Sequence, residues 1–72
     1  MLTKAKLNRF IKMRNASRFH SNLQFTIDCN ACGFSLHDLG EATKINESRY
    51  SWNTPFGLLV EDEGKLYIRN LG

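Results

Sequence analysis

The chain has 72 residues, of which 42% are hydrophobic and 24% are charged, and its formal net charge is +3. This length leaves room for a single domain, residues 1–72, with a modest core, and the apolar fraction is too high for a disordered tail. The longest apolar run is too short to cross a membrane, and no signal peptide is expected. We expect no enzyme, because a typical catalytic pocket is hard to build and shield at this size.

The charge is unevenly distributed along the chain. Six of the ten basic residues lie in the first eighteen positions, and no acidic residue precedes Asp28. Such a basic block attracts polyanions, such as nucleic acid, or an acidic protein surface. An ordinary solvated helix that carries Lys and Arg outward explains the same pattern.

Residues 3–15 are predicted to form the first helix. Leu7, Phe10 and Ile11 follow helical spacing and form one apolar stripe. Lys4, Arg9 and Lys12 project from other sides of this helix, and Lys6 lies near the edge of the stripe. Residues 23–28 alternate apolar and polar side chains, which predicts a half-buried strand.

The second half is predicted to contain two short helices and a hairpin. Residues 30–33 form a turn, Ser35 caps a helix over 36–44 with Asp38 in a weak capping-box position, and Asn46 starts a helix over 47–52. Residues 58–61 and 65–69 flank a turn in which Gly64 can adopt a positive φ. The predicted fold is a small α+β domain with a three-stranded antiparallel sheet, ending in a β-hairpin.

The segment from Ser35 to Trp52 resembles a helix-turn-helix. Gly40 stands where that family has a small residue, and Ile45 and Tyr50 stand where it has apolar anchors. With the hairpin as a wing, residues 36–70 are similar to a winged helix. The resemblance implies a recognition helix that enters the major groove of DNA, with Arg49 reading bases. The expected nucleic-acid-binding residues are Lys4, Lys6, Arg9, Lys12, Lys44, Asn46, Ser48, Arg49 and Ser51.

Cys29, Cys32 and His37 give the spacing C-x2-C-x4-H, which looks like three quarters of a zinc knuckle. The fourth ligand would fall at Ala42, so only His20 could complete the set. We therefore expect two small buried thiols, no metal and no cofactor. Closely spaced, reduced thiols also fit a cytoplasmic location better than a secreted one.

Two functions remain open at this point. One is a DNA-binding transcription regulator. The other is a compact inhibitor or adaptor, of the kind found in phages and mobile elements, that docks on a larger nucleic-acid-handling protein, for instance on an acidic face. Its candidate anchors are the aromatic residues Tyr50, Trp52, Phe56 and Tyr67. A homodimer is compatible with either function. DNA binding is favoured if the basic helix shares a face with residues 46–52, and a protein partner if it does not.

Overall fold

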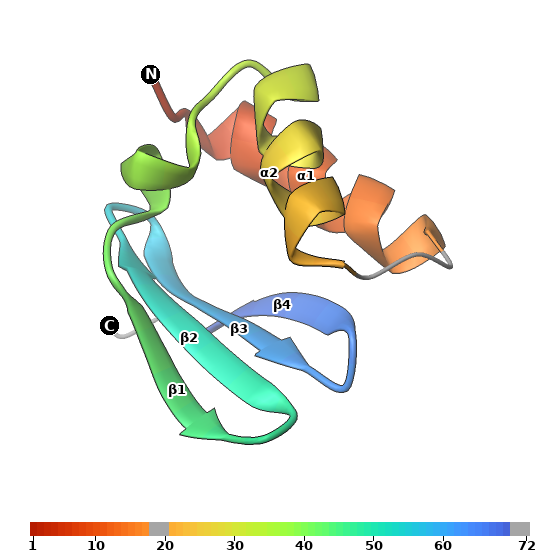
Figure 1. Ribbon diagram of the computed structural model, residues 1–72. Coiled ribbons are helices and arrows are strands. Elements are labelled where there is room, and N and C mark those ends of the chain that lie inside the picture. Colours follow the sequence, from red (N-terminus) through yellow and green to blue (C-terminus); the bar gives the residue numbers. More distant parts are fainter. Residues whose placement is uncertain (18–20, 70–72) are drawn as a thin grey trace.

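The structure is a computed structural model in which residues 1–17 and 21–69 are described. It is an α+β fold in which two helices lie over one side of a four-stranded antiparallel sheet (Figure 1). The strand order β1-β2-β3-β4 follows the chain. The elements are α1 (Lys4–Ala16), α2 (Asn22–Ala31), the short 3-10 helix η1 (Leu36–Leu39), β1 (Ala42–Asn46), β2 (Arg49–Thr54), β3 (Gly57–Asp62) and β4 (Lys65–Arg69).

Helix α1 confirms the first predicted helix. The Thr3 hydroxyl caps it by accepting a hydrogen bond from the Lys6 backbone N–H at 3.2 Å. Leu7 and Phe10 are buried and Ile11 is partly buried, as the stripe predicted. The stripe also includes Arg14, which is only 1% exposed.

The predicted strand over residues 23–28 is wrong, because this segment belongs to α2. Ser21 caps the helix by accepting a hydrogen bond from the Gln24 N–H at 3.1 Å. The buried positions Phe25, Cys29 and Cys32 have helical spacing, whereas Leu23 is 72% exposed. The apolar residues that alternate in the sequence therefore do not share one face, because Phe25 is buried whereas Leu23 and Ile27 are exposed.

The predicted helix over residues 36–44 is replaced by η1 and β1. Ser35 does occupy the N-cap, and its backbone N–H donates to Asp38 Oδ2 at 3.1 Å. Gly40 then takes a φ of +85°, which ends the helix, and a Cβ there would lie 3.0 Å from the Asn53 carbonyl oxygen. This close approach brings the chain onto the sheet as β1.

The predicted helix over residues 47–52 is also wrong, because these residues form the β1–β2 turn and most of β2. Asn46 Oδ1 accepts a hydrogen bond from the Ser48 N–H at 2.9 Å, so it closes a turn rather than capping a helix. Trp52 then pairs with Ala42 on β1 and Leu59 on β3. The sheet consequently has four strands rather than three, and the two helices of the expected helix-turn-helix are not present.

The C-terminal hairpin is confirmed as β3 and β4. Its turn contains Glu63 and Gly64, whose φ angles are +50° and +83°. Two successive positive φ angles suit the right-handed twist of a tight hairpin. Glycine adopts a positive φ at no steric cost, which is why Gly64 marked the turn in the sequence.

A buried ion pair joins the two helices. Arg14 Nη1 lies 3.1 Å from Asp28 Oδ2, and both residues are buried. Gln24 Nε2 donates to the other carboxylate oxygen at 2.9 Å, and the Arg14 guanidinium lies 5.1 Å from the centre of the Phe25 ring. Because breaking such a pair leaves a charge buried, this contact fixes how α1 and α2 pack.

Candidate functional site

The predicted nucleic-acid-binding residues do not lie on one face. Lys4, Arg9 and Lys12 are exposed on α1, which packs against α2 and β4. The other predicted residues lie on β1, on β2 and in the turn between them, and β1 and β4 are opposite edges of the sheet. The predicted residues are therefore divided between α1 and the part of the sheet around the β1–β2 turn.

The two basic residues predicted around the β1–β2 turn, Lys44 and Arg49, are engaged within the molecule. Arg49 Nη2 lies 2.7 Å from Asp62 Oδ2, and this hydrogen bond raises the pKa of Arg49 above its usual value. The Lys44 Nζ lies 3.6 Å from a Glu47 carboxylate oxygen. The guanidinium that was expected to read a base is thus held on the sheet by a carboxylate.

The remaining residues of that set are small and polar, and they serve the hairpin. The Ser48 hydroxyl donates to Asn46 Oδ1 at 3.2 Å, and Ser51 is only 7% exposed within β2. Their side chains stabilise the local turn or lie inside the sheet. None of them projects from a helix toward solvent, as the recognition-helix prediction required.

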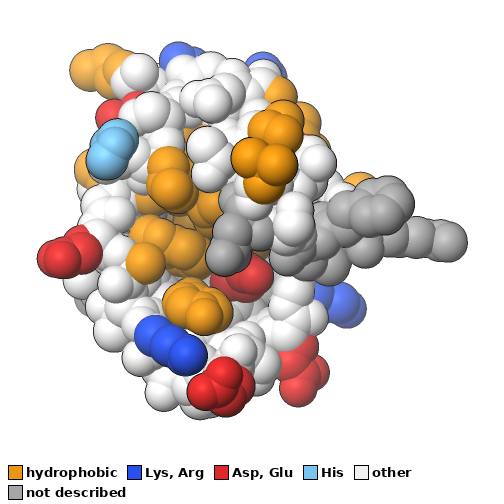
Figure 2. Space-filling model, viewed as in Figure 1, with side chains coloured by type: hydrophobic (Ala, Val, Ile, Leu, Met, Phe, Trp, Pro, Cys, Tyr) orange, Lys and Arg blue, Asp and Glu red, His pale blue; other side chains and the backbone are white. Residues whose placement is uncertain are grey.

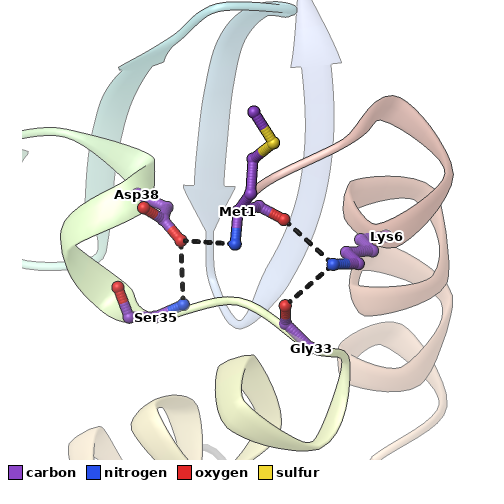
Figure 3. A network of polar contacts seen from close by, with 5 residues as sticks. All are labelled: Met1, Lys6, Gly33, Ser35 and Asp38. Atoms are coloured by element: carbon purple, nitrogen blue, oxygen red, sulfur yellow. Dashed lines mark hydrogen bonds and ion pairs between the residues drawn. The ribbon is translucent and has the colours of Figure 1, made fainter.

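Lys6 belongs to a polar network at the start of the chain (Figure 3). Its Nζ donates to the carbonyl oxygens of Met1 and Gly33, at 3.0 and 3.1 Å. The Met1 amino nitrogen lies 3.7 Å from Asp38 Oδ2, which also accepts from Ser35. Lys6 therefore joins α1 to the loop before η1.

The cysteines do not form a reactive or metal-binding centre with other described residues. Cys29 and Cys32 are buried free thiols, and burial raises the pKa of Cys29 to about 12 and also raises that of Cys32. At neutral pH both are protonated, so they are poor nucleophiles and poor metal ligands. No group of three potential ligands occurs within residues 1–17 and 21–69, and His20 lies outside the described residues.

The face shown in Figure 2 is hollowed by a groove of about 660 Å³ between the sheet and the segments α2 and η1. Its floor is formed by the strands and its walls by α2, η1 and the linker that follows η1. The lining residues are Phe25, Thr26, Leu36, His37, Gly40, Glu41, Ala42, Tyr50, Trp52 and Glu61.

The groove exists because the helices cover the sheet unequally. Helix α1 lies against β4, whereas all five residues of β1 are exposed. Trp52 of β2 stacks on Phe25 of α2, with ring centroids 5.2 Å apart and an angle of 17° between the planes. This stack marks where helical cover ends, and the sheet continues beyond it to β1.

The groove is apolar along its centre and acidic at its margin. Figure 2 shows hydrophobic side chains gathered in the middle of this face, with acidic, basic and histidine side chains around them. Glu41 and Glu61 are the acidic lining residues, His37 also lines the groove, and among the described residues none of the lining side chains is Lys or Arg. The groove is therefore suited to an occupant with apolar and positively charged groups.

The four aromatic residues expected as interface anchors lie in different places. Tyr50 and Trp52, which were expected as interface anchors, line the groove, although Trp52 is only 6% exposed. The other two expected anchors lie elsewhere: Phe56 packs against the core, and Tyr67 is 40% exposed on β4. Phe25 was missed because its segment was assigned to a strand; the Ser21 cap was the signal that could have corrected this.

Comparison with known proteins gave no match to a protein family, to a curated protein or to a solved structure. Within the described residues, no helix is long and apolar enough to cross a membrane. The groove and the charged surfaces are therefore the observations from which a function can be argued.

Proposed function

We propose that this chain is a non-enzymatic protein-binding module that holds a segment of a larger protein in the groove. The observation that carries the proposal is the combination of an aromatic floor with an acidic margin in one hollow of about 660 Å³. A hollow of this size accommodates a few side chains of a peptide. This role corresponds to the compact inhibitor or adaptor considered from the sequence.

The chemistry of the lining favours a protein segment over a small polar substrate. Aromatic residues with a polar edge, such as Tyr50 and Trp52, are common anchors at protein interfaces. Among the described residues the buried thiols are protonated, and Asp38 is engaged with Ser35 and Met1. The groove therefore offers contact area and charge rather than an activated nucleophile.

The experiment is a selection of random heptapeptides displayed on phage against the full chain. Selected peptides are then made synthetically, and their affinity is measured from the fluorescence of Trp52, the single tryptophan. We expect Ala42→Phe, which fills the groove from β1, to weaken binding by about tenfold or more. Thr43→Phe, at the adjacent exposed position whose side chain points to the other face, is the matched control.

Two results would contradict the proposal. In the first, no peptide is enriched over an uncoated surface. In the second, peptides are enriched but Ala42→Phe and Thr43→Phe bind them as tightly as the unmodified chain, which would place the contact outside the groove. Circular dichroism of both variants checks that the sheet is retained.

A second candidate is nucleic-acid binding by α1, without the predicted recognition helix. Lys4, Arg9 and Lys12 are exposed, no ion pair involves them in the described part of the chain, and α1 has no acidic residue. Such a helix binds phosphate backbones with little sequence preference and with strong salt dependence. Fluorescence anisotropy with random duplex DNA tests this candidate, which fails if no binding occurs at about 50 mM salt.

A further inference from the structure

We infer that the partner binds as an extended segment that adds to β1 as a fifth, antiparallel strand and sends alternate apolar and basic side chains into the groove. The inference rests on the proposed function and specifies the partner's conformation and chemistry. It follows from where the free backbone groups of β1 point, which side chains share their face, and the charge of the groove.

The direction of the β1 backbone groups follows from the hydrogen bonds of its neighbours. The Glu63 N–H donates to the Ser48 carbonyl at 3.0 Å, so the pair that directly adjoins the start of β2 and the end of β3 is hydrogen-bonded. In an antiparallel ladder, hydrogen-bonded pairs alternate with pairs that are not hydrogen-bonded. The pair Arg49–Asp62 is therefore not bonded through its backbone groups, and Tyr50–Glu61 is the next bonded pair. The Tyr50 N–H and C=O therefore point toward β3 and away from β1.

The same alternation continues to the edge. Ser51 points its backbone groups toward β1 and pairs with Thr43. Ala42 and Lys44, on either side of Thr43, consequently direct their N–H and C=O groups away from the sheet. These four groups are the ones with which the partner's extended segment, the guest strand, would form hydrogen bonds.

The side chains of the same two residues face the groove side of the sheet. Ala42 is opposite Trp52, and Lys44 is opposite Tyr50, and both aromatic residues line the groove. Residues directly opposite each other in a ladder share a face. Guest residues that bond to Ala42 and Lys44 therefore direct their side chains to the groove side, while the residue between them points to the other face.

The charge of the groove selects the guest side chains. Glu41 precedes Ala42, Glu61 lies opposite Tyr50, and the exposed Lys44 ammonium lies 3.6 Å from a Glu47 carboxylate oxygen. A Lys or Arg on the guest meets these carboxylates, and an apolar side chain two positions away covers Tyr50 and Trp52. The β-bulge between Lys44 and Asn46 limits regular pairing to residues 42–44, so the guest segment is short.

A partner protein fits this edge better than a second copy of the chain. Antiparallel pairing of two β1 strands would bring Lys44 of one copy opposite Ala42 of the other. The apolar side chain that each copy then offers is the methyl group of Ala42, which leaves the aromatic floor uncovered. We therefore assign the occupant as a segment with a larger apolar residue beside a basic one.

The peptides selected from the random library test the inference in two ways. We expect enrichment of Lys or Arg two positions from an aliphatic or aromatic residue. We also expect N-methylation of either of these two residues to weaken binding by about fivefold or more, the effect of one lost hydrogen bond, and N-methylation of the residue between them to have little effect.

A matched pair of variants tests the edge from the side of this chain. Lys44→Pro removes an outward N–H without removing a bond to β2, so the sheet is retained while peptide affinity falls about fivefold or more. Lys44→Thr removes the same ammonium, keeps the N–H, and is expected to bind like the unmodified chain. Backbone NMR spectra of both variants confirm that the remaining sheet is intact.

The possible outcomes separate the inference from the proposed function. If peptides bind and Ala42→Phe blocks them, but alternate N-methylation and Lys44→Pro have no effect, strand addition is wrong and groove binding stands. Enrichment of acidic residues, or of apolar residues at helical spacing, likewise overturns the inference alone. A stable dimer in analytical ultracentrifugation that Lys44→Pro dissociates would assign the edge to a second copy instead. If no peptide binds, both proposals fail.

Discussion

The two edges of the sheet are treated differently by the rest of the molecule. At β4, the Asn15 side chain of α1 accepts a hydrogen bond from the Leu66 N–H at 2.7 Å and donates to the Leu66 carbonyl at 2.9 Å. At β1, the described residues provide no corresponding contact, and every residue of the strand is exposed. One amide side chain thus takes the place of a neighbouring strand at β4, and the opposite edge stays available for pairing.

The closed edge depends on where α1 is held. Arg14 immediately precedes Asn15 and is anchored by Asp28 of α2 in the buried ion pair. The pair fixes the end of α1 over β4, where Asn15 can reach the Leu66 backbone. The difference between the edges therefore originates in the packing of the two helices rather than in the strands themselves.

The largest expected effect comes from breaking the buried pair. Asp28→Leu leaves the Arg14 guanidinium buried without its carboxylate, which we expect to lower the free energy of unfolding by about 3–5 kcal/mol. For a domain of this size such a loss is a large share of the total stability, so thermal denaturation should begin at a much lower temperature. The double variant Arg14→Met with Asp28→Leu replaces both charges and should recover most of the loss. Equal stability of the single and double variants would contradict this role of the pair.

The next effect concerns the closing amide itself. Asn15→Ala leaves the Leu66 N–H and C=O without their partner, and we expect a loss of about 1–3 kcal/mol in urea denaturation. Asn8→Ala, an exposed change on the same helix, is the control and should leave stability nearly unchanged. The Asn15 variant should also self-associate at high concentration, because it opens a second edge. A monomer of unchanged stability would show that Asn15 does not close β4.

The sequence predicted the parts of the fold that local chemistry determines. The apolar stripe with Leu7 and Phe10 identified α1, and the Asp62–Gly64 turn identified the hairpin. The strand prediction over residues 23–28 was wrong because Leu23 and Ile27, which produced the apolar alternation, are exposed at 72% and 48%. The helix predictions over residues 42–52 were wrong because Gly40 and Asn46 are compatible both with the ends of helices and with the turns that lead into strands. The groove could not be predicted, since it depends on how far the helices extend over the sheet.

Hydrogen exchange compares the two edges directly. The Leu66 amide is bonded to Asn15, whereas the amides of Ala42 and Lys44 point away from the sheet by the alternation of the ladder. We expect Leu66 to exchange roughly tenfold or more slowly than Ala42 and Lys44, because its exchange requires a local opening. Thr43, which points toward β2, should be slow as well and serves as the internal control. Slow exchange at Lys44 in the absence of a peptide would show that its N–H is already paired.

The smallest effect reports on the covered half of the molecule, where α2 meets the core. Burial raises the pKa of the Cys29 thiol from 9.0 to about 12, so the folded state favours the protonated form. This contribution to stability is fully present below pH 9.0 and is lost as the pH rises toward about 12. We expect no change in stability from this group between pH 6 and 8 and a decline at higher pH, measured by urea denaturation. Cys29→Ala removes the titrating group, so its stability should decline less steeply over the alkaline range, and an identical slope would show that Cys29 ionises as readily in the folded state as in the unfolded one.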